Sequence, residues 1–322
     1  MRSIETGQTF PLAAVKPLDQ LADYREFCLS ATRQRLKRSS RPRGASPITG
    51  KPMRPIGDVA GLPYSLCAET GSLFLSEVCE PKEWEELLAE TSRRHHAAGR
   101  KDGKLSQSRT DNVFAPKVDW IRETLAMQGI RRPRILEAVT PPSEMGSLLK
   151  ECQSFAEVET VNVMELAHSV AAGPRAASEE VIVMLETLDQ VDDPRKLLQN
   201  ASTRMKNNGL LFVTALVASG FDLEVLGLKS QYLYPPDRTN CFSVRGLQRL
   251  LESEGFKLWE VSTPGVLDVE IVQAHLQADS ELPLSRFERQ IVEADPETRK
   301  EFQLFLQRNR LSSHARIVAK KQ

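Results

Sequence analysis

The sequence predicts an α/β protein with a mostly parallel sheet that is covered by helices on both faces. From about residue 117 onward, short apolar runs alternate with segments whose apolar residues recur at helical spacing. Parallel neighbouring strands need a crossover long enough to hold a helix, and each pair of apolar runs here is separated by such a segment or a loop of similar length. This alternation favours helices packed on the two faces of one sheet.

The elements of this region follow from local patterns. Pro133 and Pro141 bound one buried strand, Gly255 ends a helix, and Asn208-Gly209 predicts a turn. In order, we expect a helix at 117–128, a strand at 134–139, a helix at 143–152, strands at 158–165 and 179–188, a helix at 192–207, a strand at 210–217, a helix at 243–255, a strand at 256–265, one or two helices within 284–310, and a closing strand at 314–320.

The first hundred residues lack the alternation of strands and helices that the rest of the chain shows. A helix is expected near 18–36, a small hairpin unit from Ser46 to Cys79, a helix at 80–90, and an exposed basic loop at 91–109. We therefore divide the chain into a basic extension (1–44), a hairpin unit with a helix and loop (45–109), and the α/β domain (110–322).

Composition limits the classes of function. The 322 residues carry 43 Lys and Arg against 43 Asp and Glu, so overall charge gives no reason to expect nucleic-acid or membrane binding. No apolar stretch is long enough to span a membrane, and the N-terminus lacks the pattern of a signal peptide. The five cysteines are scattered, which suits a reducing compartment, and we expect a cytoplasmic protein.

Four motifs in the α/β region carry a family resemblance. They are RILEA at Arg134–Ala138, VNVME at Val161–Glu165, VIVMLETLDQVDDP at Val181–Pro194 and MKNNGLLFVTAL at Met205–Leu216. In this order the sequence resembles the class I S-adenosylmethionine (SAM)-dependent methyltransferases, in particular a bacterial group with a small zinc ribbon in front. The resemblance implies a Rossmann-like, mostly parallel seven-stranded sheet.

The resemblance also implies where SAM and a substrate would lie. SAM would lie over the carboxyl ends of the strands, with Glu165 at the second strand's end accepting hydrogen bonds from the ribose hydroxyls. The cofactor residues, if SAM binds, would be Glu137, Thr140, Gly146, Glu165 and Glu186. The substrate-side candidates are Tyr232, Tyr234, Asp237, Arg238, Asn240 and Asp268.

The loop after the first strand departs from the family pattern. Aligned on Glu137, the three glycine positions fall on Val139, Pro141 and Ser143. Glycine allows close approach to a ligand and positive φ, whereas a β-branched residue or proline does neither. Thr187 moreover stands where the related group has a histidine that could act as a base. A shifted loop that keeps SAM through Gly146 is the alternative.

The hairpin unit has lost the residues of a zinc site as well. Zinc ribbons use two C-x-x-C-G turns, because four thiolates close a tetrahedral site. Here the turns read S-P-I-T-G from Ser46 and C-A-E-T-G from Cys67, so the four ligand positions are Ser46, Thr49, Cys67 and Thr70. We expect no metal at this degenerate ribbon.

The loop after Glu137 and the two ribbon turns have both lost residues that would bind a ligand, while the motifs around them remain recognisable. This favours a methyltransferase-like protein that binds neither SAM nor another cofactor. Such a protein would act as a scaffold or interaction subunit with a protein partner. Its docking surfaces would be the basic N-terminal segment and the C-terminal helices, although the apolar residues of those helices also fit a packed core (Phe287, Ile291, Phe302, Phe305 and Leu306). The alternative is an active SAM-dependent methyltransferase on a sugar or small metabolite. Nucleic-acid binding is opposed by the zero net charge.

Overall fold

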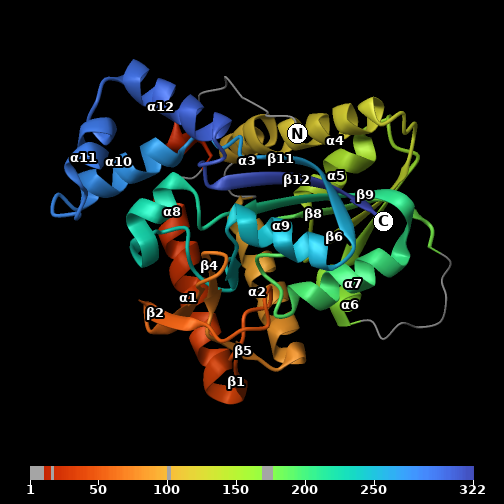
Figure 1. The fold of residues 1–322 in the computed structure, drawn as a ribbon, viewed down its shortest axis with the longest axis horizontal. Coiled ribbons are helices and arrows are strands. Elements are labelled where there is room, and N and C mark those ends of the chain that lie inside the picture. Colours follow the sequence, from red (N-terminus) through yellow and green to blue (C-terminus); the bar gives the residue numbers. More distant parts are fainter. Residues whose placement is uncertain (1–10, 16–17, 100–102, 169–176) are drawn as a thin grey trace.

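A computed structural model describes residues 11–15, 18–99, 103–168 and 177–322. Figure 1 shows one central sheet with helices above and below it, and a smaller unit of short strands and two long helices packed beside it. The C-terminal helices lie at the upper left of this view.

The central sheet has six strands among the described residues, in the order β11-β12-β9-β8-β6-β7. Strands β7, β6, β8 and β9 run parallel, and β12 is antiparallel to both of its neighbours. The sheet therefore has one strand fewer than the resemblance implies, and residues 169–176, between β7 and β8, lie outside the described chain. The bounds are β6 Arg134–Val139, β7 Glu157–Asn162, β8 Glu179–Leu185, β9 Met205–Leu216, β11 Phe256–Ser262 and β12 His314–Lys321.

Helices cover both faces of this sheet, as predicted. Ile135 and Phe212 pack with α4 (Ala115–Met127) and α5 (Glu144–Glu151), whereas their sequence neighbours Leu136 and Leu211 belong to the core on the other face. This alternation is what a pleated strand buried on both sides produces. The second face carries α6 Val163–His168, α7 Pro194–Arg204 and α9 Val244–Ser253.

The N-terminal unit is joined to the α/β domain by a shared sheet. Strand β10 (Asn240–Cys241), from the α/β domain, pairs antiparallel with β4 in the order β10-β4-β3-β2. Buried residues of both parts form one continuous apolar core. The bounds in this unit are α1 Leu18–Ser39, β1 Ser40–Pro42, β2 Arg54–Val59, β3 Leu62–Cys67, β4 Ser72–Leu75 and β5 Glu77–Cys79.

The prediction of an exposed loop at 91–109 is wrong, because most of this range is helical. Helix α2 runs from Pro81 to Gly99, and α3 (Gly103–Arg109) continues through a π-helical turn (Thr110–Phe114) into α4. Trp84, Leu87, Leu88 and Thr91 are buried at the spacing of one helix face, so packing extends the helix beyond its predicted end.

Other differences are local. The strand expected at 158–165 ends at Asn162, and its last residues start α6 instead. The expected turn at Asn208-Gly209 lies inside β9, where Asn208 takes a φ of 66°. The remaining helices are α8 Phe221–Leu226, α10 Asp268–Ala278, α11 Arg286–Val292 and α12 Pro296–Arg308. Within the described residues, no helix combines the length and apolarity needed to cross a bilayer.

Candidate functional site

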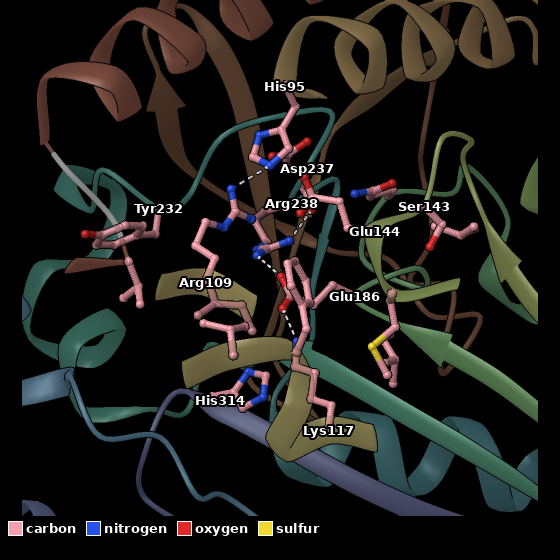
Figure 2. Close-up of a pocket in the computed structure, with 18 of the residues that line it drawn as sticks. His95, Arg109, Lys117, Ser143, Glu144, Glu186, Tyr232, Asp237, Arg238 and His314 are labelled. Carbon is pink, nitrogen blue, oxygen red and sulfur yellow. Dashed lines mark hydrogen bonds and ion pairs between the residues drawn. The ribbon is translucent and has the colours of Figure 1, made fainter. Parts of the chain in front are cut away.

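A cavity of about 470 Å³ lies at the carboxyl ends of β6 and β8 (Figure 2). The chain leaves β6 towards β7 and leaves β8 towards β9, on opposite sides, so this is the switch point of the sheet where α/β proteins bind ligands. The cavity is lined by the loop after β6, the end of β8 and the starts of α4, α10 and β12, and residues of α1, α2 and α3 also contribute.

The loop after β6 is held by the side chain of Glu137. Its two carboxylate oxygens accept hydrogen bonds from Ser143 Oγ at 2.6 Å and Thr160 Oγ1 at 3.0 Å. Ser143 Oγ in turn accepts from the amide of Gly146 and caps α5. Burial raises the pKa of Glu137, and the two hydroxyls partly offset this. Both carboxylate oxygens are thus engaged within the protein.

Glu186 occupies the end of β8 in a strained conformation. Its φ is 56°, which is rare for a residue other than glycine and is a feature of functional sites. The carboxylate bridges two cations, with Lys117 Nζ at 3.1 Å and Arg238 Nη2 at 2.8 Å (Figure 2). Behind Arg238, at 3.4 Å, lies Asp189, whose pKa is raised to about 8 by burial despite the nearby guanidinium.

Two tyrosines hold Asp237 at another wall of the cavity. Tyr24 of α1 donates to one carboxylate oxygen at 3.2 Å, and Tyr234 donates to the other at 3.3 Å. Burial raises the pKa of Asp237 against the effect of Arg238 and these hydroxyls. The N-terminal helix α1 is thereby part of the cavity wall.

Arg109 is held in the cavity by a neutral histidine. Its Nη1 lies 3.0 Å from Nε2 of His95, which can accept only when that nitrogen is unprotonated. Burial, and then the charge of Arg109, lower the pKa of His95 to about 4. The adjacent His96 lies 3.6 Å from Glu144, and their hydrogen bond lowers the pKa of that carboxyl group.

This arrangement predicts a pH dependence of stability. Because the pKa of His95 falls from 6.5 to about 4 on folding, its contribution is present above pH 6.5 and is lost as the pH falls towards 4. His95→Gln keeps an acceptor for Arg109 and does not titrate. We expect the wild type to lose up to about 3 kcal/mol of unfolding free energy relative to this variant between those pH values. Urea unfolding at several pH values measures it, and parallel curves for the two proteins would contradict it.

Helix α2 lies across the ends of β6 and β7. Ser92 Oγ donates to the carbonyl oxygens of Thr140 at 3.2 Å and Pro141 at 3.1 Å, in the loop after β6. Glu85, on the same helix face two turns earlier, accepts from Nδ2 of Asn162, the last residue of β7, at 3.4 Å. Trp84 fixes the helix further, since its Nε1 donates to the carbonyl of Gln190 at 2.9 Å.

The structure brings most of the predicted site residues together. The cavity is lined by Glu137, Thr140 and Glu186 among the cofactor candidates, and by Tyr232, Tyr234, Asp237, Arg238 and Asp268 among the substrate-side candidates.

Three predicted site residues lie elsewhere. Glu165 is exposed on α6, because β7 ends before it, so it does not reach the cavity. Gly146 lies inside α5, packed against the Glu137 carboxylate. Asn240 is fully buried and donates to the carbonyls of Leu188 and Val191. Thr187, which stands where the related group has a histidine, donates to the carbonyl of Ala138 at 3.0 Å and does not line the cavity.

Asp268 lines the cavity but is held by the protein itself. Its carboxylate accepts from Ser312 Oγ at 2.6 Å, the Ser313 amide at 2.6 Å and Gln303 Nε2 at 2.8 Å. Asp268→Ala leaves three buried donors without this acceptor, so we expect a loss of about 3 kcal/mol in unfolding free energy. Asp119→Ala, which removes an exposed ion pair, should cost under about 0.5 kcal/mol in the same denaturant experiment. Equal losses in the two variants would refute the assignment.

The two turns of the N-terminal unit have the same geometry. The Gly50 amide donates to Ser46 O at 2.9 Å and the Gly71 amide donates to Cys67 O at 2.8 Å, and both glycines have positive φ. Thr49 Oγ1 lies 3.8 Å from Cys67 Sγ. Burial alone would raise the pKa of Cys67, but hydrogen bonds with Ser46, Thr70 and Thr49 outweigh it and lower that pKa. The four predicted ligand positions therefore converge, and the described residues contain no cluster of three His, Cys, Asp or Glu side chains suited to a metal.

Of the two candidate docking surfaces, the basic N-terminal segment forms ion pairs within the protein, whereas the C-terminal helices expose aromatic side chains. Arginines of the basic segment pair within the protein: Arg35 with Glu86 and Glu90, and Arg41 with Asp192. On the C-terminal helices, Phe287 and Phe305 are 61% and 49% exposed, so they are not core, whereas Leu306 is buried. Phe302 contacts both of these exposed rings.

Sequence reasoning predicted Arg238 but missed the three other Lys and Arg side chains of the described chain that line the cavity. Lys117, Arg109 and Arg316 line it together with His95, and they come from a helix start, a presumed loop and a closing strand. The sequence signal that could have identified them is their position next to strand ends or helix starts, where α/β proteins place binding residues.

Comparison with known proteins agrees with this geometry. Residues 122–261 match the model of a family described as a methyltransferase domain. The matched residues cover less than half of the chain, and they lie within the α/β part described above. A search of curated proteins finds no match to the sequence.

Solved structures with a similar fold are distant in sequence. A 1,6-didemethyltoxoflavin-N1-methyltransferase from Burkholderia thailandensis is 12% identical, with a TM-score of 0.45, 84% of this chain covered and 99% of that chain. A putative sarcosine dimethylglycine methyltransferase from Galdieria sulphuraria is 13% identical, with a TM-score of 0.40, 70% of this chain covered and 90% of the other. Likeness at this level says nothing about the activity of the present chain.

Proposed function

We propose that this chain is a methyltransferase-like protein that no longer binds SAM or transfers methyl groups and that acts as a scaffold or interaction subunit. The observation that carries the proposal is the position of α2. Its residues Ser92 and Glu85 contact the ends of β6 and β7, where the nucleoside of SAM would lie in the fold that this chain resembles.

The residues at these strand ends do not suit SAM. β7 ends in Asn162, and its amide is engaged with Glu85 where a ribose would need a carboxylate. The carbonyls of the loop after β6 are occupied by Ser92, and Pro141 has no amide hydrogen to offer. None of the described residues 157–168 lines the cavity.

Displacing α2 to admit a nucleoside would be costly. Trp84, Leu87 and Leu88 are 0–2% exposed, and burying each such side chain contributes about 1.5–3 kcal/mol. Their combined contribution is comparable to the roughly 8 kcal/mol that a micromolar ligand supplies. A SAM molecule that had to move the helix would therefore retain little net affinity.

An interaction role is supported by the exposed aromatic residues of the C-terminal helices. Three of the four large apolar side chains that the described chain exposes, Phe287, Phe305 and Leu311, come from this region. Clustered exposed aromatic rings are a feature of protein interaction sites. We infer a protein partner for this surface and, from the scattered free cysteines, a cytoplasmic location.

Isothermal titration calorimetry with SAM and with its demethylated product S-adenosylhomocysteine tests the loss of cofactor binding. We expect no saturable heat with either compound and no rise in melting temperature. One-site binding at micromolar affinity, with the rise in melting temperature that mass action requires, would refute the proposal.

A second candidate function is SAM-dependent methyl transfer to a sugar or small metabolite. It is favoured by the cavity itself, in which strained Glu186 and the predicted substrate-side residues meet. Formation of S-adenosylhomocysteine from SAM with candidate acceptors would support it, and its loss in Glu186→Gln would assign it to this cavity.

A further inference from the structure

Arg316 of β12 is buried without the partner that a guanidinium usually has. It is 8% exposed, it lines the cavity, and its guanidinium lies 5.4 Å from the ring centre of Trp120. No carboxylate in the described part of the chain lies within 4.0 Å of it, and its buried Nε has no hydrogen-bond partner there. An arginine offers five donors, and leaving them unpaired inside a protein is unfavourable.

The counter-charge that acts on Arg316 is the fully buried Glu260, which forms no ion pair with it within 4.0 Å. Glu260 influences Arg316 through space, but its Oε1 accepts from Nε1 of Trp120 at 2.9 Å. Burial lowers the pKa of Arg316 to about 10, so the group stays charged at neutral pH. Arg316 therefore has a buried counter-charge nearby but, among the described residues, no carboxylate in direct contact.

The other cations of the cavity are Lys117, Arg109 and Arg238, and five carboxylates of the described chain line it with them (Glu137, Glu144, Glu186, Asp237 and Asp268). Glu186 is shared between Lys117 and Arg238, and Arg109 is bonded to neutral His95 with no carboxylate within 4.0 Å among described residues. Figure 2 shows Lys117 and Arg238 directed at Glu186 and Arg109 directed at His95, with His314, two residues before Arg316, near Lys117.

Each carboxylate on the wall has a partner within the protein, including Glu144 with His96 and Glu186 with Lys117 and Arg238. Glu137 is bonded to two hydroxyls, Asp237 to two tyrosines, and Asp268 to a hydroxyl, an amide and a glutamine. The buried Nε of Arg316 is a donor without a partner among the described residues, and Thr140 Oγ1 is another buried polar atom of the wall without one. A charged guanidinium with unpaired donors favours an anionic ligand.

The rest of the wall is apolar. Leu21, Leu88, Val113, Phe114 and Ile271 line the cavity. Its volume of about 470 Å³ lies in the range of small-molecule sites. A ligand that fills this space needs an apolar body as well as a charged head.

We propose that this cavity binds a small organic carboxylate, with its carboxylate group on Arg316 and its apolar body between α1, α2 and the start of α4. The planar guanidinium can hold a carboxylate through two parallel hydrogen bonds, and Trp120 stacks on it from the other side. This inference does not depend on the proposed function, because it concerns Arg316 and not the nucleoside edge under α2.

Calorimetric titration of the full chain with 4-phenylbutyrate and with the neutral 4-phenylbutanamide tests it. We expect the carboxylate to bind at least tenfold more tightly than the amide. Arg316→Met keeps the length and packing of the side chain, should fold because it removes an unpaired buried charge, and should weaken the carboxylate at least tenfold while leaving the amide unchanged. Arg122→Met, on the exposed side of α4, is the matched control and should bind like the wild type.

Several results would overturn the proposal. These are equal affinity for acid and amide, no binding of the carboxylate by the wild type, or unchanged binding by Arg316→Met. SAM also carries a carboxylate, so it is titrated in the same series. SAM binding that is lost in Arg316→Met would assign the guanidinium to SAM and would overturn both this proposal and the proposed function. Carboxylate binding without SAM binding supports both.

Discussion

Replacing Ser46, Thr49 and Thr70 by cysteine should create a tight zinc site with Cys67. The two turns already bring these positions together, and the 3.8 Å between Thr49 Oγ1 and Cys67 Sγ matches the sulfur–sulfur separation of about 3.8 Å in tetrahedral zinc thiolates. We expect a Kd in about the nanomolar range or below, since structural zinc sites contribute roughly 10 kcal/mol or more. Competition with a chromophoric chelator measures the affinity.

The control is the same triple variant with Cys67→Ser, which keeps three thiols and should bind zinc far more weakly. A melting temperature that rises with zinc only in the four-cysteine protein, and returns on chelation, would complete the result. If the four-cysteine protein folds and binds no zinc, the two turns do not have the geometry of a ribbon.

Replacing Trp84 by alanine should cost about 3–5 kcal/mol of unfolding free energy, the range for removing a large buried aromatic side chain. Trp84 is fully buried in the core that the N-terminal unit shares with the α/β domain, and its Nε1 anchors α2 to the carbonyl of Gln190. Denaturant unfolding measures the loss.

Trp84→Phe separates the two contributions. It keeps most of the apolar volume and loses the hydrogen bond, so a smaller loss of about 1–2 kcal/mol is expected. A cost below about 1 kcal/mol for Trp84→Ala would mean that α2 is not held against the strand ends as described.

The α/β domain could be predicted from sequence because its signals are local. The runs Arg134–Val139 and Glu179–Leu185 are short, apolar and bounded by breakers, and each became a central parallel strand. The order of four motifs then indicated a Rossmann-like, mostly parallel sheet. The end of β7 was misplaced because Val161–Glu165 continues an apolar pattern that fits a strand and a helix start equally well.

The site was predictable only in part. Glu137, Glu186 and Arg238 lie near strand ends or in the following loops, where position in sequence indicates position in the cavity. Helix α2 was underestimated because the polar residues at 91–99 look like a loop until the tertiary contacts of Thr91 and Ser92 are known. Arg316 reads as one polar position in an alternating strand, and only the packing of Trp120 over it shows that it is buried.

A crystal structure of the chain grown with excess SAM tests the position of α2 most directly. We expect α2 to lie across the ends of β6 and β7, with Ser92 on the carbonyls of Thr140 and Pro141 and no nucleoside there. A SAM molecule lying between α2 and the end of β7, with Ser92 moved off the loop, would contradict it.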